Sequence, residues 1–173
     1  MPESLTSMHP FDLSDDAGYQ RWRETKLSDY TCTTAAPVVQ INDASELASH
    51  EYEEIMARCR KSNMAIYQVG AGTDTDKQAI RAFGRQFGLE KLDMNLRADE
   101  DSITSLRVVE AGTGAHYIPY TNRPLNWHTD GYYNRLDEQV RGIVMHCVST
   151  SASGGDNLFL DPEIAYLLLR DEN

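Results

Sequence analysis

The sequence predicts an α+β fold, because helical patterns dominate its first half and short strand-like runs dominate its second half. Apolar side chains recur at helical spacing between residues 42 and 61 and again between 73 and 87. Beyond Gly88 the chain changes to short β-type runs separated by Gly, Pro, Asn and Ser. Helices followed by strands favour an antiparallel sheet that the early helices cover.

Two amphipathic helices with a short strand between them are predicted in the first half. The helices cover Asn42–Lys61 and Thr73–Phe87, and Gly88 is the expected stop of the second. Candidate N-caps are Asn42 or Asp43 for the first helix and Thr73 or Asp74 for the second. The apolar run Met64–Val69 ends at glycines, so we expect a strand there.

Further elements are predicted on either side of this pair. Gly18–Leu27 has the aromatic content of a short helix, and Asp161 followed by Pro162 marks the start of a last helix that runs to Arg170. Between them we expect β-type segments at Ile103–Val109, Asn126–Thr129, Val140–Val148 and Asn157–Leu160. We divide the chain into an N-terminal extension over residues 1–37 and one domain over residues 38–173.

Composition excludes several classes of function. Lys plus Arg number 16 against 27 Asp plus Glu, and the net charge of −11 argues against a nucleic-acid or anionic membrane surface. No apolar run approaches the roughly 18 residues of a membrane span, and no signal peptide is visible at the N-terminus. The cysteines, Cys32, Cys59 and Cys147, lie at wide spacings typical of reduced thiols. We therefore expect a cytoplasmic location.

The densest chemical signal is the segment Asn126-Trp127-His128-Thr129-Asp130-Gly131. In extended backbone, residues i and i+2 point to the same side, so His128 and Asp130 would present an imidazole and a carboxylate to one point. These are two of the three ligands of the facial triad of non-haem Fe(II) oxygenases, which leaves positions open for a co-substrate and O₂. A surface strand whose His and Asp only hydrogen-bond each other is the alternative.

The order of motifs around this segment resembles a known family. Trp127-His128-x-Asp130 is followed by Gly154-Gly155-Asp156-Asn157 and then by a helix with Ala-Tyr, and a Phe-Gly pair ends the earlier helix at Gly88. This order is similar to the taurine dioxygenase and γ-butyrobetaine hydroxylase superfamily of Fe(II)/2-oxoglutarate-dependent dioxygenases. The resemblance implies a double-stranded β-helix (a cupin-like jelly-roll), here partial, with the N-terminal helices packed on the sheet.

The resemblance also implies an activity and a set of site residues. The family uses Fe(II), the cosubstrate 2-oxoglutarate and O₂ to hydroxylate an aliphatic C–H of a small molecule. Carried onto this chain, His128 and Asp130 are Fe(II) ligands, and Asn157 stands where many members place a Thr that contacts 2-oxoglutarate. Asn126, His116 and Tyr132 are candidates for the substrate pocket.

Most of these side chains also have an ordinary structural explanation. Trp127 is expected in the core, and Tyr132 could simply cover a sheet. His116 lies in a glycine-containing loop, where an exposed histidine is the default. His146, in the predicted strand Val140–Val148, is a candidate third metal ligand, although a histidine in a buried strand is more often a hydrogen-bonded core residue.

The family's second metal His and its 2-oxoglutarate Arg come from strands after the Gly-Gly turn. No His follows Asn157 here, and Arg170 is the one Arg in that stretch. We therefore expect the chain to stop before the catalytic domain is complete. It is then a truncated dioxygenase, one half of a two-chain enzyme, or a non-catalytic binding module. Open sheet edges would favour a homo-oligomer or a complementing chain.

Overall fold

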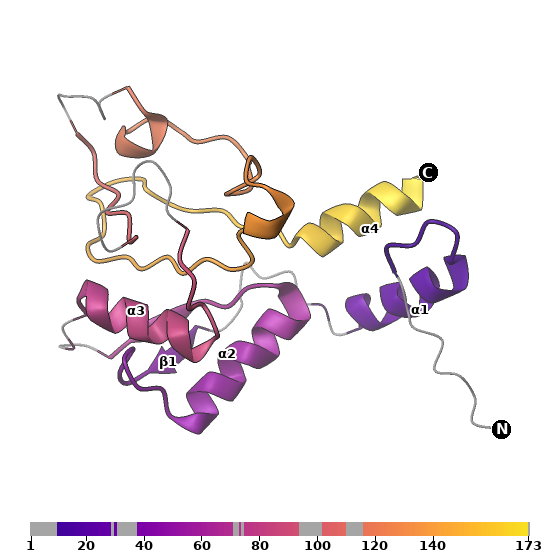
Figure 1. The fold of residues 1–173 in the computed structure, drawn as a ribbon, viewed down its shortest axis with the longest axis horizontal. Helices are drawn as coiled ribbons and strands as arrows, with labels where there is room; N and C mark the ends of the chain where they lie inside the picture. The colour runs from indigo at the N-terminus through magenta and orange to yellow at the C-terminus, as the bar shows by residue number, and fades with distance from the viewer. Residues whose placement is uncertain are drawn as a thin grey trace. The chain divides into compact units, whose positions relative to one another are not determined.

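A computed structural model describes the chain in two compact units (Figure 1). The first unit comprises residues 1–43, 47–73 and 150–173, and the second unit comprises residues 44–46 and 74–149. The residues that the structure describes are 10–28, 30, 38–70, 73, 75–93, 102–109 and 116–172. The predicted division at residue 37 stays a prediction, and much of the predicted extension lies outside the described residues.

A β–α–β arrangement forms the centre of the first unit. Strand β1 (Val39–Ile41) pairs in parallel with β2 (Tyr67–Val69), and helix α2 (Ser49–Ser62) connects them. Val39 and Ile41 are fully buried, and Ile55 of α2, only 5% exposed, lies on the side of the helix that packs against β1. The strand expected within 64–69 is confirmed. The antiparallel sheet is wrong for the described residues, because a helical crossover joins strands in parallel.

Helix α2 begins later than its sequence pattern predicted, because a buried glutamate accepts hydrogen bonds from the residues before the helix. Glu51, 1% exposed, accepts hydrogen bonds from the Asn42 backbone and side-chain nitrogens at 2.9 and 2.8 Å and from the Ala48 backbone at 2.8 Å. Asn42 is therefore a partner of Glu51 and not an N-cap. The predicted caps at Asn42 or Asp43 are wrong, and Ala48 occupies the capping position.

Helices α1 (Asp16–Leu27) and α4 (Pro162–Glu172) confirm both terminal helix predictions and lie side by side in the first unit (Figure 1). Tyr19 of α1 and Leu167 of α4 are each 3% exposed. The Tyr19 hydroxyl donates to Asp171 Oδ1 at 2.8 Å, and the same carboxylate pairs with Arg23 at 2.8 Å. Apolar and polar contacts thus join two helices from opposite ends of the sequence.

A group of polar side chains around the buried Lys26 and Asp161 links the ends of three helices, and we call it the Asp161 cluster (Lys26, Tyr30, Asn63, Asp161 and Glu163). Lys26 Nζ lies 2.7 Å from Asp161 Oδ2 and 2.5 Å from Glu163 Oε2, and the side chains of Lys26 and Asp161 are 5% and 1% exposed. Asn63, the C-cap of α2, donates to Asp161 Oδ1 at 2.9 Å, and Tyr30 donates to Oδ2 at 3.3 Å. Asp161 also caps α4, because it accepts from the Glu163 backbone at 2.9 Å.

Burial and hydrogen bonding act in opposite directions on the charges of this cluster. Burial alone would lower the pKa of Lys26, but hydrogen bonds to Asp161 and Glu163 outweigh it and raise that pKa. Burial alone would raise the pKa of Asp161, but the bonds from Lys26, Asn63 and the Glu163 backbone lower it. Both groups are therefore held in their charged forms.

The second unit contains helix α3 (Lys77–Gln86) and the short 3₁₀ turns η2 (Ile118–Tyr120) and η3 (Leu136–Glu138). Asp76 caps α3 by accepting from the Ala79 backbone at 2.8 Å. The predicted cap at Thr73 is therefore wrong, and Asp74 lies outside the described residues. Gly88, with φ at +78°, ends the helix as predicted, because glycine adopts this left-handed conformation without a steric penalty.

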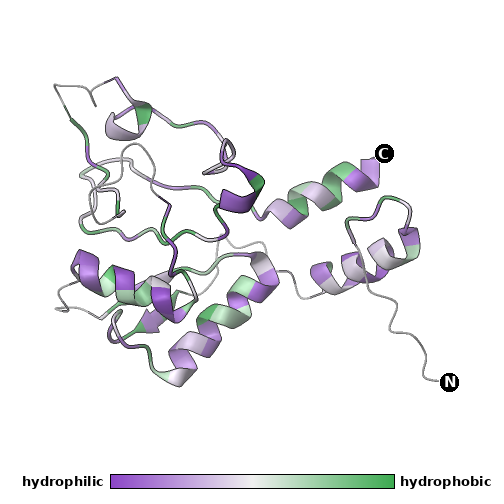
Figure 2. Cartoon of the chain, viewed as in Figure 1, coloured by the Kyte–Doolittle hydropathy of each residue, from purple (hydrophilic) through white to green (hydrophobic). Residues whose placement is uncertain are grey.

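The four later segments predicted as strands are not strands in the described part of the chain. Residues 103–109, 126–129, 140–148 and 157–160 run without regular secondary structure. Figure 2 shows hydrophobic stretches along them that belong to neither a helix nor a strand. Val108, Ile143, Val148 and Leu158 are 61%, 54%, 85% and 77% exposed. The sequence pattern of a strand is present, but a strand also needs a hydrogen-bonded neighbour.

The described residues are therefore α+β in content, with helices and one small sheet, and they do not show a double-stranded β-helix. Cys59 and Cys147 carry free thiols, and burial raises the pKa of Cys59. Cys32 lies outside the described residues. Among the described helices, none combines the length and the apolar character that crossing a bilayer requires.

Candidate metal centre

His128 and Asp130 point to the same place in the second unit. His128 Nε2 lies 3.5 Å from Asp130 Oδ1, and the two side chains are 44% and 58% exposed. The i and i+2 spacing predicted this shared direction, although the segment is not part of a sheet. The pair is thus preformed and accessible from solvent.

The backbone of Asn126 orients the imidazole of His128. His128 Nδ1 lies 2.8 Å from the Asn126 carbonyl oxygen. A carbonyl can only accept, so in this contact Nδ1 carries the proton, and the lone pair of the neutral ring is at Nε2, the atom nearest Asp130. Metal-binding histidines commonly donate their second N–H to a carbonyl or carboxylate in this way. The sequence suggested the Asn126 side chain for substrate contact, and the structure adds this backbone role.

A tight turn follows the pair directly and requires glycine. Gly131 has φ at +66°, and a Cβ there would lie 2.5 Å from Val140 Cγ2. The Asn134 backbone closes the turn by donating to the Gly131 carbonyl at 2.9 Å. No role was predicted for this glycine from the sequence, although Asp-Gly is a common turn dipeptide. The turn fixes the point at which the chain leaves Asp130.

The donor set fits two neighbouring corners of a divalent metal site. A small divalent cation in octahedral coordination holds oxygen and nitrogen ligands at about 2.1 Å, so adjacent ligand atoms lie about 3 Å apart. The separation of 3.5 Å between Nε2 and Oδ1 needs only a small adjustment to reach that value. An imidazole nitrogen beside a carboxylate is also the donor chemistry of non-haem iron. His128 and Asp130 therefore fit a metal, as two ligands of a larger set.

The described residues do not complete this set. No group of three or more His, Cys, Asp or Glu side chains gathers in that part of the chain. His146 is half-buried, burial lowers its pKa, and it does not join His128 and Asp130 as a third ligand there. His116 is exposed in the second unit.

Asn157 belongs to the first unit, whereas the metal pair belongs to the second. Its amide lies 3.5 Å from the Gly155 carbonyl, and its side chain is exposed. Gly154 and Gly155 have φ at +66° and +83°, and Ser151 contacts the Gly154 carbonyl. Both glycines therefore adopt the left-handed conformation that favours glycine. The contact of Asn157 with 2-oxoglutarate stays a prediction.

Two aromatic residues near the pair are exposed. Trp127 is 67% exposed, so its predicted place in the core is wrong. Tyr132 is 79% exposed and stacks edge-on with Tyr133, with ring centroids 5.3 Å apart. Its proposed place in a substrate pocket stays a prediction.

The comparisons with known proteins identify the family. The sequence profile of the family described as "Taurine catabolism dioxygenase TauD, TfdA family" matches residues 24–173. The chain belongs to this family. The resemblance found from the Trp-His-x-Asp and Gly-Gly-Asp-Asn motifs is thus confirmed, and the family match begins at residue 24, near the end of α1.

One relative extends the TauD/TfdA assignment. A protein named "Uridine-5'-phosphate dioxygenase" from Streptomyces sp is 31% identical over 105 residues, which cover 53% of this chain and 38% of that protein. The chain thus spans less than half the length of the curated relative it matches. No solved structure matches the chain. Both names denote dioxygenases, which supports an oxygenase at the level of reaction class.

Proposed function

We propose that this TauD/TfdA chain provides the metal-binding part of an Fe(II)- and 2-oxoglutarate-dependent dioxygenase that hydroxylates an aliphatic C–H bond of a small molecule. The observation that carries the proposal is the His128–Asp130 pair. The Asn126 carbonyl contacts Nδ1 of His128, and the ring then has Nε2 on the side of the Asp130 carboxylate. Family membership supports the same chemistry.

Each site residue has a defined task in this proposal. His128 Nε2 and Asp130 Oδ1 hold Fe(II), and the Asn126 carbonyl keeps the His128 proton on Nδ1. The bound iron supplies oxidation of the substrate with O₂ and 2-oxoglutarate. Asn157 donates its amide N–H to a carboxylate of 2-oxoglutarate. The proposed substrate contacts are the Asn126 side chain, His116 and Tyr132.

The proposal includes the fold that would surround this site. The four segments with strand-like sequence become strands of a partial jelly-roll when neighbouring strands pair with them, and their exposed apolar side chains support this. The third metal ligand comes from a His beyond the described residues or from a second chain. The expected cytoplasmic location agrees with the free thiols of Cys59 and Cys147.

Anaerobic titration of the chain with Fe(II) in the presence of 2-oxoglutarate tests the proposal. We expect a visible charge-transfer band that saturates with Fe(II) and disappears in His128→Ala. His50→Ala is the matched control, because His50 is an exposed histidine on α2 in the other unit. A band that is unchanged in His128→Ala would show that this pair does not hold the iron.

The name of the relative suggests the first substrate to test. Uridine 5′-phosphate is the compound in that name, and the matched region covers about half of this chain. We expect Fe(II)- and 2-oxoglutarate-dependent oxygen consumption to increase when it is added. Oxygen consumption that is the same with and without uridine 5′-phosphate would remove this compound while leaving the metal-binding proposal in place.

A non-catalytic binding module is the second candidate, because the described residues supply two metal ligands and no third. On this alternative the folded chain binds its partner equally well with and without His128. An unchanged circular dichroism spectrum together with the absence of the Fe(II) band would favour it. Appearance of the band only after mixing with another chain would instead identify one half of a two-chain enzyme.

A further inference from the structure

One polar side chain connects the turn that follows Asp130 to other parts of the second unit. Asn134 ends this turn, and its backbone N–H donates to the Gly131 carbonyl at 2.9 Å. Its side-chain amide donates to Asp93 Oδ1 at 3.1 Å and to the Glu138 carbonyl at 3.1 Å. Asn134 thus joins the turn both to the segment that carries Asp93 and to the 3₁₀ turn η3.

The chemistry of these contacts selects a primary amide at position 134. An ionised carboxylate and a carbonyl oxygen only accept, so the group between them has to present two N–H donors, and a primary amide has two. Because both partners accept, the contacts themselves decide that Nδ2 faces them. Asn134→Asp would keep the shape of the side chain, lose both donors and place a second negative charge beside Asp93.

The turn is also closely packed at Gly131. A Cβ there would lie 2.5 Å from Val140 Cγ2 and 3.4 Å from Asn134 Nδ2. The Val140 side chain and the Asn134 amide therefore both lie against this glycine, which leaves the turn little room to shift. Since Asp130 directly precedes Gly131, a turn held in this way restricts the backbone that carries the Asp130 carboxylate.

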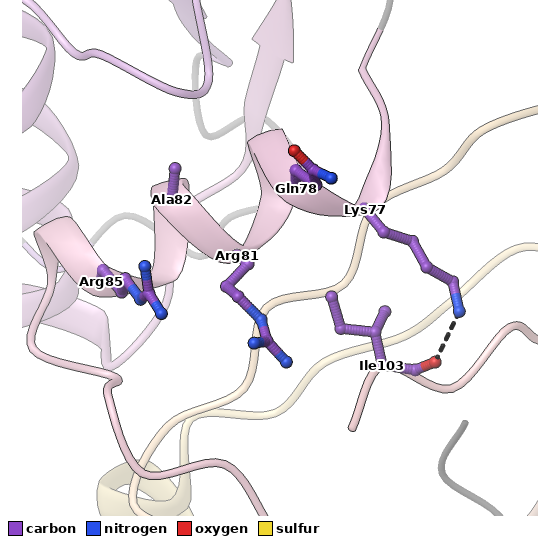
Figure 3. A pocket seen from close by; sticks show the side chains of 6 residues that line it. All are labelled: Lys77, Gln78, Arg81, Ala82, Arg85 and Ile103. Atoms are coloured by element: carbon purple, nitrogen blue, oxygen red, sulfur yellow. Dashed lines mark hydrogen bonds between the residues drawn. The ribbon is translucent and has the colours of Figure 1, made fainter. Parts of the chain in front are cut away.

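The segment that carries Asp93 is a suitable support, because it follows α3 and contacts other parts of the second unit. Leu89, in the same segment, lies against Gly142, where a Cβ would be 3.0 Å from Leu89 Cδ2. At the start of α3, Lys77 Nζ donates to the Ile103 carbonyl at 3.1 Å (Figure 3). Helix α3 and the residues after it therefore contact two other segments of the chain, and the Asp93 contact adds the turn to them.

Such support matters because the metal pair is exposed. The side chains of His128 and Asp130 are 44% and 58% exposed, so burial does not select their rotamers. The Asn126 carbonyl orients the ring of His128. For Asp130, the accessible rotamers depend on the backbone dihedral angles, and freedom that is lost only on binding weakens affinity. A fixed turn therefore favours a fixed direction of the carboxylate.

We propose that Asn134 is a positioning residue for the metal pair. By holding the Gly131 turn to Asp93 and to η3, it keeps the Asp130 carboxylate directed at His128 Nε2, at the observed separation of 3.5 Å. Asn134 acts through Asp130, and its effect on metal binding follows from that direction. The inference deepens the proposed function and rests on it for the metal, whereas the direction of the carboxylate is measurable without metal.

NMR of the metal-free chain tests this role. The three-bond couplings from the Asp130 backbone nitrogen and carbonyl carbon to Cγ report the χ1 rotamer of this side chain. We expect the values of one dominant rotamer in the wild type and averaged values in Asn134→Asp. Asn122→Asp, the same change on an exposed residue of the same unit, should leave the couplings unchanged. Averaged couplings already in the wild type, or equal couplings in the wild type and Asn134→Asp, would overturn the proposal.

Two further variants separate the Asp93 contact from a general loss of the turn. Asp93→Ala removes one acceptor from outside the turn, so its Asp130 couplings should fall between those of the wild type and Asn134→Asp. Asp93→Asn combined with Asn134→Asp reverses donor and acceptor, and should return the couplings part of the way to the wild type. Wild-type couplings in Asp93→Ala together with no recovery in the double variant would show that Asp93 does not hold the turn.

Titration with Mn(II) connects this geometry to metal binding. The His128 resonances should broaden at about fivefold higher Mn(II) concentration in Asn134→Asp than in the wild type, because the net contribution of one hydrogen bond corresponds to about this factor in an equilibrium constant. Equal concentrations would overturn the role of Asn134 in metal binding. A wild type that binds no Mn(II) would count against the proposed function, whereas the Asp130 couplings test Asn134 independently of it.

Discussion

The Asp161 cluster of the first unit and the segment that carries the His128–Asp130 pair differ in how deeply their polar side chains are buried. Around the Asp161 cluster, Lys26 and Asp161 are buried almost completely, and every helix end there has a partner from another helix. In the segment over residues 121–149, His128 and Asp130 are exposed, as are Trp127 and many neighbouring apolar side chains. The cluster is thus packed at its centre, whereas the His128–Asp130 pair and many side chains around it are open to solvent.

The difference shows what sets the geometry in each region. The helices are positioned by contacts between residues far apart in sequence, such as Lys26 with Asp161. The metal pair is positioned by contacts within a few residues, from the Asn126 carbonyl to His128 and then through the Gly131 turn. The contact of the Asn126 carbonyl with His128 does not depend on residues far away in the sequence.

Removal of Lys26 should give the largest loss of stability. Lys26→Met leaves the buried carboxylate of Asp161 and the partly exposed carboxylate of Glu163 without their cation, and breaking a buried pair typically costs about 3–5 kcal/mol. Urea denaturation in a Trp127→Phe background measures this, because Trp22 of α1 is then the single reporter. Arg60→Met is the control, since the pair of Arg60 with Glu53 is exposed and should contribute about 0–1 kcal/mol.

Truncation of leucines should separate the packed region from the exposed one. Leu167→Ala in α4 removes a side chain that is 3% exposed, and we expect a loss of about 2–5 kcal/mol in the free energy of unfolding. Leu136→Ala, at 82% exposure, should change it by less than about 0.5 kcal/mol. Equal losses in the same urea titration would show that the segment over residues 121–149 is as well packed as the helices.

Acid should weaken the Asp161 cluster by a smaller amount than Lys26→Met. The pKa of Asp161 is lowered in the fold, so its contribution to stability is present above its ordinary pKa of 3.8 and is lost as the pH falls through the folded value. The hydrogen bonds from Asn63 and the Glu163 backbone can persist after protonation. Melting temperatures between pH 6 and 3 should fall less steeply in Asp161→Asn than in the wild type, and parallel curves would refute this assignment.

The smallest expected effect on stability is at the turn before Asn157. Gly155→Ala places a Cβ 2.7 Å from Ser151 Oγ at a φ of +83°, and a left-handed non-glycine residue costs about 1–2 kcal/mol. Gly154→Ala has a similar φ but meets no atom within 4 Å, so it should cost less. Thermal melts of the two variants give the difference in stability loss. An equal loss would show that the backbone conformation alone, without the Ser151 contact, sets the cost of the substitution.

Local signals predicted the parts of the fold that depend on local chemistry. Asp161 followed by Pro162 placed the start of α4, and Gly88 placed the end of α3. The start of α2 was missed, because it depends on Glu51 reaching back to Asn42 across a loop. The parallel pairing of β1 and β2 was also missed, since a strand of three residues leaves almost no periodic pattern.

The candidate site also has features that the sequence predicted and features that it did not. The common direction of His128 and Asp130 follows from their spacing, and the sequence predicted it. The role of the Asn126 carbonyl could not be predicted, because every residue has a carbonyl and only the backbone path decides where it points.

The most direct test of the central claim, that His128 and Asp130 form a metal-binding pair, is NMR of the histidine side chains during titration with Mn(II). Neutral His128 should carry its proton on Nδ1, and its resonances should broaden at lower Mn(II) concentrations than those of His50, His116 and His146. Asp130→Asn should abolish this preference. A proton on Nε2 of neutral His128, or equal broadening of these histidines, would contradict the account.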